Sequence, residues 1–298
     1  MGLQAFVSSF LLILSLEHIP ATFGAPANSA DAANTLRSLS MEIAENLPSQ
    51  LDKVELMAAP KVDFTYKGQP EDMEVAAGDS FTLTCEAEGI PPPTLRWLHN
   101  GRPIEQGRFE SDDNSYEKLL NLGKLTVQHG ITSSRLAVKC ADEGAAGVYS
   151  CVADNGHTKR LTHARVDVVS SGESTKCEEK KEGGSPARIY MWTLGRFENS
   201  GANAQLFCRA AGSPAPTIRW YAEDGEGNSV LLDSSDKRHV ILPSGDLLVR
   251  DAQDMATYYC EAENKYGKDR IENFFYVTSP DESGDSNDLA EPFGEESF

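Results

Sequence analysis

The chain has 298 residues, of which 40% are hydrophobic and 24% charged, which provides apolar residues for about two domain cores. Lys and Arg total 27 against 46 Asp and Glu, so the formal net charge is −19 and nucleic acids and anionic lipid surfaces are poor partners. Beyond the N-terminal region there is no long apolar run, so the sequence predicts no membrane anchor.

The N-terminal region has the pattern of a secretion signal. The run from Phe6 to Leu16 is apolar and too short to span a bilayer, and small residues follow at Ala21 and Gly24. No Lys or Arg precedes the run, which departs from the usual pattern. A buried core helix is the alternative, and Pro20 argues against it. We expect residues 1–24 to be removed and the mature protein to be secreted, where cysteines form disulfides.

Residues 25–59 form a leader in which apolar residues keep a helical spacing from Leu36 to Leu47 and stop before Pro48. Two forms of this leader are open, a short helix that docks on a partner and a frayed or disordered segment. At the other end, residues 279–298 hold seven acidic residues and no basic one. We expect this tail to be disordered; its spacing does not require calcium binding.

A duplicated pattern divides the rest of the chain. Segments of thirteen residues that begin at Cys85 and Cys208 match at eight positions, and each ends in a Trp. Each is followed by a Tyr-x-Cys motif; the landmarks are Trp97, Tyr149 and Cys151 in the first copy and Trp220, Tyr258 and Cys260 in the second. The repeat predicts domains over 60–170 and 186–278, joined by a polar linker over 171–185.

Between these landmarks the sequence predicts short strands. Apolar residues alternate from Phe81 to Cys85, from Leu136 to Val138 and from Leu247 to Val249, and turn-forming residues bound each run. The spacing from Cys to Trp to Tyr-x-Cys in each half resembles the immunoglobulin β-sandwich of the intermediate type. The resemblance implies an all-β fold with two tandem sandwiches.

The resemblance also assigns roles to the landmarks. It implies that Trp97 and Trp220 pack in the cores, and that each landmark Tyr hydroxyl bonds back to the chain at a tyrosine corner. Asp254, four residues before Tyr258, matches the usual corner. Ala145 stands at the same place before Tyr149, so the first corner lacks the expected charge.

The resemblance pairs Cys85 with Cys151 and Cys208 with Cys260 as disulfides between the two sheets of each sandwich. Cys140, just beyond the strand of Leu136 and Val138, and Cys177 in the linker are left over. We expect a Cys140–Cys177 bridge that pins the linker to the base of domain one. An intermolecular disulfide and two free thiols are the alternatives that stay open.

No motif predicts catalysis, a cofactor or a metal. The six His form no zinc pair, and the sequence has no Gly-x-Ser-x-Gly elbow and no phosphate-binding glycine loop. We therefore expect a binding protein and not an enzyme. A secreted enzyme or enzyme inhibitor is the remote alternative.

Tyr190 and Trp192 are the candidate partner contacts. Both lie on the first strand of domain two, outside the landmarks, where strand alternation puts them on one face and Ile189 and Met191 on the other. Packing in the core or at the domain junction is the competing interpretation. The run from Phe274 to Tyr276 presents the same choice.

The whole arrangement resembles the small secreted two-immunoglobulin (zwei-Ig) proteins of nematodes. The two domains, the two extra cysteines and the runs Lys118–Lys124 and Gly195–Glu198 carry this resemblance. Domain two, above all from Ser244 to Lys268, is also similar to the insect two-immunoglobulin protein that binds insulin-like peptides.

The resemblance implies an extracellular protein partner. Among the nematode proteins the implied role is to maintain axon position, through a neuronal surface receptor or a matrix protein. Capture of an insulin-like peptide is the second hypothesis. It requires an exposed apolar patch of several hundred Å², whereas adhesion works with a more polar interface.

Overall fold

The computed structural model describes residues 63–107, 115–169, 177, 184–233 and 236–279. The expected secretion signal, the leader, almost all of the acidic tail and most of the linker lie outside these residues. Among the described residues, no helix has the length and apolar character needed to cross a bilayer.

The described part of domain one contains eight strands and two short helices. In chain order they are β1 (Asp63–Gly68), β2 (Met73–Ala76), β3 (Phe81–Ile90), β4 (Thr94–His99), β5 (Arg102–Pro103), α3 (Ser115–Leu120), β6 (His129–Val138), the 3₁₀ helix η2 (Glu143–Ala145), β7 (Gly147–Asp154) and β8 (Lys159–Val169). Burial along β3 alternates strictly, which places its apolar residues on one face, as period-two sequence requires.

Nine strands lie in the described residues of domain two. They are β9 (Ser185–Asn199), β10 (Ala204–Leu206), β11 (Cys208–Ser213), β12 (Thr217–Glu223), β13 (Ser229–Leu231), β14 (His239–Ile241), β15 (Leu247–Val249), β16 (Ala256–Asn264) and β17 (Gly267–Thr278). β9 is the longest strand of the described chain, with 15 residues.

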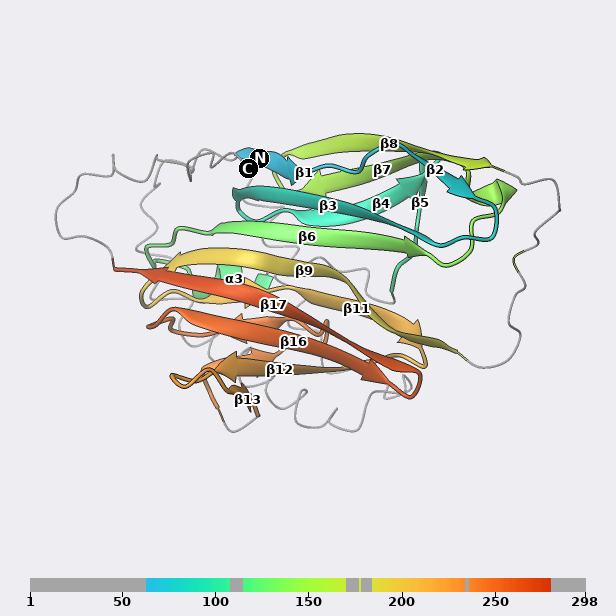
Figure 1. Ribbon diagram of the computed structural model, residues 1–298. Coiled ribbons are helices and arrows are strands. Elements are labelled where there is room, and N and C mark those ends of the chain that lie inside the picture. The colour runs from blue at the N-terminus through green and yellow to red at the C-terminus, as the bar shows by residue number, and fades with distance from the viewer. Residues whose placement is uncertain (1–62, 108–114, 170–176, 178–183, 234–235, 280–298) are drawn as a thin grey trace, which may run out of the picture.

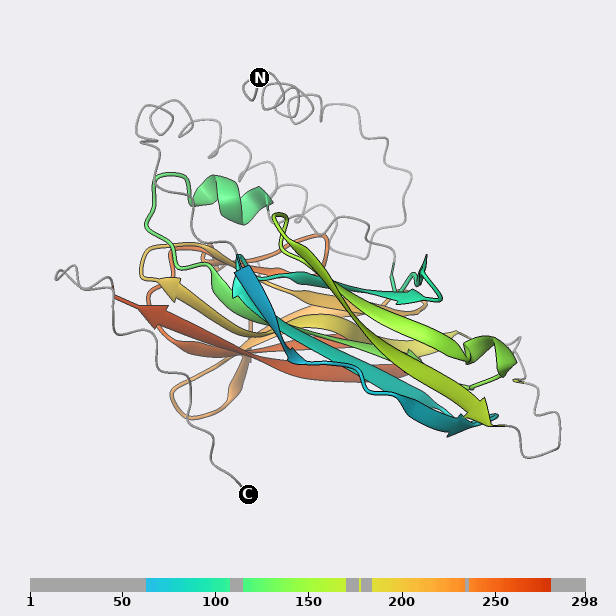
Figure 2. The ribbon, with the colours of Figure 1, turned by 90° about the horizontal axis from the view of Figure 1, so that it is seen from above.

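One sheet runs through both domains (Figure 1). Its strands follow the order β1–β3–β6–β9–β17–β16–β12–β13, and β11 pairs with the first part of β9. The second layer is divided into a five-stranded sheet, β2–β8–β7–β4–β5, and a three-stranded sheet, β10–β15–β14. The two sandwiches, which follow each other in the chain, therefore lie side by side along a shared sheet (Figure 2).

The landmarks occupy the centres of the two sandwiches. Trp97 and Trp220 are fully buried, and the chain forms the disulfides Cys85–Cys151, Cys208–Cys260 and Cys140–Cys177. Each inter-sheet disulfide lies in the core cluster of its own domain, with the Trp of that domain. Both sandwiches are thus immunoglobulin-type, and the prediction of an all-β fold with two tandem sandwiches is confirmed, with α3 and η2 as short helical additions.

The tyrosine corners are the reverse of the expected pattern. Tyr149, whose domain lacks the corner Asp, donates from its hydroxyl to the carbonyl oxygen of Ala145 at 2.9 Å. Asp142 replaces the missing charge by accepting a hydrogen bond from the Ala145 N–H at 3.1 Å. In domain two the Tyr258 hydroxyl lies 2.8 Å from Nε2 of His239, while Asp254 is exposed. The expectation that the Tyr258 hydroxyl bonds to the backbone was wrong, because His239 on β14 is its hydrogen-bond partner instead.

Candidate binding surface

The two domains are joined through backbone hydrogen bonds between β6 and β9. The strands are antiparallel, and their register runs from His129 opposite Phe197 to Ser134 opposite Met191. The register shifts once, between Ile131 and Thr132. The joint is therefore a piece of regular sheet and not a contact between two closed surfaces.

Small polar side chains on β6 make this approach possible. Thr132, Ser133 and Ser134 are completely or almost completely buried. The indole N–H of Trp97 donates to Oγ of Ser134 at 3.0 Å, and Ser134 donates to the carbonyl oxygen of Tyr190 at 2.7 Å. A chain of hydrogen bonds thus leads from the core Trp of domain one into the backbone of domain two.

Helix α3 adds a charged cluster to the joint. Arg196 on β9 is buried between two carboxylates, with its Nη2 donating to Glu117 of α3 and, at 3.0 Å, to Glu198. Glu198 also accepts backbone N–H bonds from Val127 and Gln128. Because Glu117 is completely buried, desolvation raises its pKa, against the lowering effect of Arg196.

Helix α3 also covers an apolar patch of domain two. Val240, Leu242 and Leu248 form a small buried cluster, against which Tyr116 and Leu120 pack. Next to it, the Asn121 side chain exchanges hydrogen bonds with the backbone of Asn203, as donor at 2.7 Å and as acceptor at 2.8 Å. Domain two is therefore held on its strand edge by β6 and on one flank by α3.

The solvent-facing side of the shared sheet carries an aromatic row across the joint. His129 of β6 stacks on Phe197 of β9 with ring centroids 5.1 Å apart, and Phe197 stacks on Tyr276 of β17 at 4.8 Å. Phe274, two residues along β17, is 38% exposed and Tyr276 is 40% exposed. We call this solvent-facing side the joined face, since residues of both domains form it.

Charged residues border the aromatic row within domain one. His129 Nε2 lies 2.7 Å from Oε1 of Glu88, and Lys67 pairs with Oε2 of the same carboxylate. Burial of the imidazole lowers the pKa of His129, and the charges of Arg196 and Lys67 lower it further. Burial thus disfavours the charged form of this imidazole in the row.

The domain-two part of the joined face is a tyrosine cluster around Arg270. The guanidinium of Arg270 lies 4.4 Å from the ring centroid of Tyr259 and 5.2 Å from that of Tyr221. The Tyr259 hydroxyl donates to Glu223 at 2.8 Å, and this hydrogen bond is the main reason that its pKa is raised to about 12. The joined face thus combines aromatic rings with fixed charges.

Tyr190 and Trp192 lie at the joint, where both are half-buried. The expectation that they share one strand face was wrong. Tyr190 packs against the core of domain one and Trp192 against that of domain two. The cause is a β-bulge, since Arg209 lies opposite Met191 and Ala210 lies opposite Ile189, which leaves Tyr190 as an extra residue.

Sequence reasoning missed the buried ion cluster and the joined face. Arg196 and Glu198 fall in the Gly195–Glu198 run, which served only as a family marker. Phe275 is core, whereas its neighbours Phe274 and Tyr276 are exposed. No group of His, Cys, Asp and Glu among the described residues is arranged to hold a metal ion.

Comparisons with known proteins agree with this architecture. The family model for the immunoglobulin domain matches residues 64–155 and 176–264. Zwei Ig domain protein zig-3 of Caenorhabditis elegans is 36% identical over 253 residues, which are 84% of this chain and 94% of the relative. Zwei Ig domain protein zig-4 of the same organism is 33% identical, over 91% of this chain and 95% of the relative.

Among solved structures, that of the neural ectodermal development factor IMP-L2 has a similar fold. Its TM-score is 0.52 at 22% identity, and the match covers 74% of this chain and 97% of that chain. The family points to binding and not to catalysis. The chain belongs to the zwei Ig domain proteins, a family of non-enzymatic proteins with two immunoglobulin domains.

Proposed function

We propose that this protein is secreted and binds an extracellular protein partner across the joined face. The aromatic row carries the proposal, because its rings extend over β6, β9 and β17 and so belong to both domains. Aromatic side chains with nearby Arg residues are the composition that anchors protein interfaces. A partner centred on this row contacts both sandwiches at once.

The preferred partner is a neuronal surface receptor or a matrix protein that helps to hold axons or neurites in position. The mixed character of the joined face supports it, since Glu88, Lys67 and Arg270 border the rings and suit a polar rim. The solved structure with the similar fold is named neural ectodermal development factor, and this name supports a role in nervous tissue.

Binding of an insulin-like peptide is the second candidate. The exposed rings of Phe274 and Tyr276 favour it, because a small helical hormone needs an apolar surface on which to pack. This hypothesis and the first use the same face and differ in the partner.

A binding assay with matched variants tests the proposal. The secreted protein is immobilised and exposed to neuronal receptor ectodomains, matrix proteins and insulin-like peptides. Phe274→Arg is expected to weaken binding at least about tenfold, because it places a charge in the centre of the face. Met255→Arg, at an exposed site in the turn before β16, is the control that keeps binding.

The outcome also separates the two candidates. Sub-micromolar binding of a peptide that Phe274→Arg abolishes establishes the hormone hypothesis. Binding of a receptor or matrix protein that Phe274→Arg abolishes and Met255→Arg keeps establishes the hypothesis of a neuronal or matrix partner. Equal binding by Phe274→Arg and the original protein overturns the use of the joined face.

A further inference from the structure

Domain one has a second sheet whose outward face is not covered by any described element. The sheet β2–β8–β7–β4–β5 turns Thr162, Ala164 and Val166 of β8 toward the core, where they are buried. The alternate residues point outward. Leu161 is 47% exposed, Val148 39% and Val169 52%, although each is a large apolar residue. We call this side of the sheet the outer face; it is separate from the joined face.

The strand register arranges the outer face in rows. Leu161 lies opposite Val152 and Arg96 follows on β4, while the next row holds His163 and Ser150, joined by a hydrogen bond of 2.8 Å. Apart from Arg96, which adjoins the row of Lys159, these rows carry apolar side chains together with Ser150 and His163, and they form the centre of the face. Leu98 extends the centre onto β4, since it pairs with Ser150.

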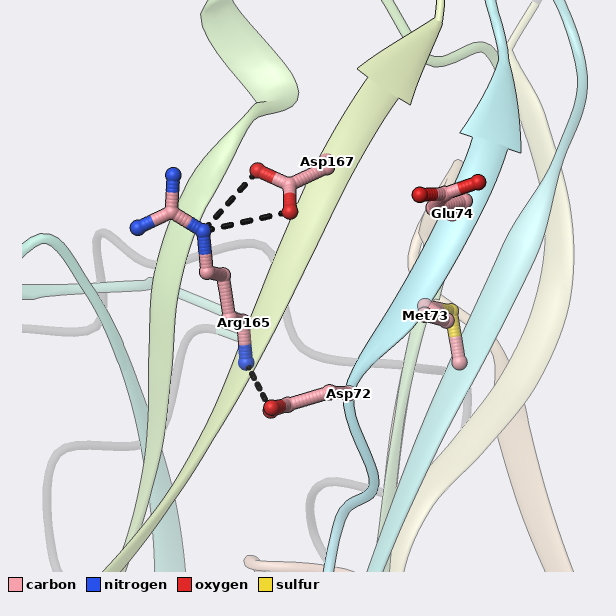
Figure 3. Close-up of a pocket in the computed structure, with 5 residues that line it drawn as sticks. All are labelled: Asp72, Met73, Glu74, Arg165 and Asp167. Atoms are coloured by element: carbon pink, nitrogen blue, oxygen red, sulfur yellow. Dashed lines mark hydrogen bonds and ion pairs between the residues drawn. The ribbon is translucent and has the colours of Figure 1, made fainter.

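The two ends of the outer face have opposite charge. Arg96 and Lys159 stand at one end with a single carboxylate, Asp154, which lies 3.0 Å from Lys159. At the other end Asp72, Glu74 and Asp167 surround a shallow hollow in which Arg165 is the one basic group (Figure 3). Because the whole chain has a net charge of −19, basic residues at one end of an apolar face differ from the acidic character of the rest of the chain.

We propose that the outer face is a homodimer interface, in which a second copy of this chain packs face to face in antiparallel orientation. A two-fold axis that crosses the strands near His163 places Lys159 of one copy on Asp167 of the other. The row of His163, Ser150 and Leu98 then lies on its counterpart, Leu161 of each copy packs over the side chain of Arg165 of the other, and the same pair of charges forms twice. The opposite, parallel orientation puts like charges together and is disfavoured.

The size of the outer face suits a weak, reversible homodimer. The strands β2, β8, β7 and β4 have 4, 11, 8 and 6 residues, and at about 3.3 Å per residue and about 4.8 Å between strands they cover roughly 460 Å². Two copies would therefore bury roughly 900 Å², within the range of weak interfaces below about 1,200 Å². The joined face stays accessible in such a dimer, so the proposal goes beyond the proposed function.

Sedimentation equilibrium of the full secreted chain tests the proposal. The original protein is expected to dimerise below about 100 μM, and Leu161→Arg to weaken dimerisation at least about a hundredfold, because it would set a second arginine against Arg165 of the other copy at two symmetric positions. Leu231→Arg is the matched control, since Leu231 is 52% exposed on β13 of domain two. It is expected to leave the dimer intact, and circular dichroism checks that both variants are folded.

A charge exchange tests the orientation. Lys159→Glu alone is expected to weaken the dimer about fivefold or more, and the double variant Lys159→Glu with Asp167→Lys to restore it, because the pair is re-formed in reversed polarity. A monomer at all concentrations overturns the proposal, as does a Leu161→Arg variant that dimerises normally. Failure of the double variant to recover overturns the antiparallel arrangement.

Discussion

The two sandwiches share their landmarks and differ in where the indole N–H of the landmark Trp finds its hydrogen-bond partner. In domain two the indole N–H of Trp220 donates to the carbonyl oxygen of Gly245, within the same domain. The buried Arg209 and Asp246 are likewise paired inside domain two, through two hydrogen bonds of 2.8 and 2.7 Å. In domain one, Trp97 bonds to Ser134, which bonds to domain two.

The apolar cores show the same asymmetry. The core cluster of domain two draws all its buried residues from 187–275. The core cluster of domain one includes Met191 and Phe207, which both belong to domain two. Met191 also accepts a hydrogen bond through its sulfur from the Leu95 N–H at 3.3 Å. Equal sequence landmarks therefore do not imply equal independence. Domain two builds its main core cluster alone and leaves only the small cluster of Val240, Leu242 and Leu248 to be covered by α3, whereas the main core cluster of domain one is completed by residues of domain two.

The largest expected effect comes from separating the domains. A fragment of residues 184–279 is expected to fold. A fragment of residues 60–178 is expected to lose its native packing, because removing Met191 and Phe207 costs about 5 kcal/mol or more, comparable to the stability of a domain. Near-ultraviolet circular dichroism and amide dispersion in NMR spectra measure both fragments. A domain-one fragment with a cooperative transition like that of the whole chain would contradict the asymmetry.

Asp246→Ala is expected to lower the free energy of unfolding by about 3–5 kcal/mol, because Arg209 would remain buried without its carboxylate. Urea denaturation measures the change. Asp254→Ala is the control; this exposed carboxylate matches the family corner but is expected to change stability by less than about 0.5 kcal/mol. If domain one depends on domain two, near-ultraviolet signals from both domains shift to lower urea concentration together.

Ser134→Ala is expected to cost about 1–3 kcal/mol, because it leaves the Trp97 indole N–H and the Tyr190 carbonyl without their buried partner. Hydrogen exchange is expected to accelerate along β6 and β9 more than in β12 and β16. Thr82→Ala, at an exposed site on β3, serves as the control. A uniform acceleration over the whole chain would show that the serine does not act at the joint.

Glu117 gives the smallest effect, visible in its pH dependence. Its folded-state pKa is raised above the usual 4.5, so the native state holds this proton more tightly than the unfolded chain. The destabilising contribution of the ionised group is present at neutral pH, falls as pH drops through the folded-state pKa and is gone below about 4.5. Relative to Glu117→Gln, the original protein is therefore expected to gain stability between pH 7 and pH 4.5. Urea midpoints at each pH test this; a constant difference would contradict it.

The sequence motifs predict the fold of each sandwich, but they give little indication that β6 of domain one pairs with β9 of domain two. The positions of Cys85, Trp97 and Tyr149 in the fold can be predicted from the sequence, because the immunoglobulin core needs these residue types at fixed places. The pairing of β6 with β9 uses backbone groups that every residue has, so no residue type marks it. The one visible trace is the small polar run Thr132–Ser134, which interrupts the apolar alternation of its strand.

Other features depend on contacts between distant parts of the chain. Alternation failed at Tyr190 because a bulge on β9 is set by its pairing with β11. The partner of Tyr258 is a His 19 residues away, which a comparison of corners does not consider. The joined face was not predicted as a unit, since His129 comes from β6 of domain one, whereas Phe197 and Tyr276 come from β9 and β17 of domain two, which are far apart in the sequence.

β9 belongs to both sandwiches at once, pairing with β6 along one edge and with β11 and β17 along the other. Two domains joined by a flexible linker lose rotational freedom when one ligand binds both, and this entropic cost lowers the affinity. A strand shared in this way has already removed that freedom during folding. A partner that spans the two sandwiches meets them in a single fixed geometry, so its contacts on the second domain add to affinity without a further entropic penalty for aligning the domains.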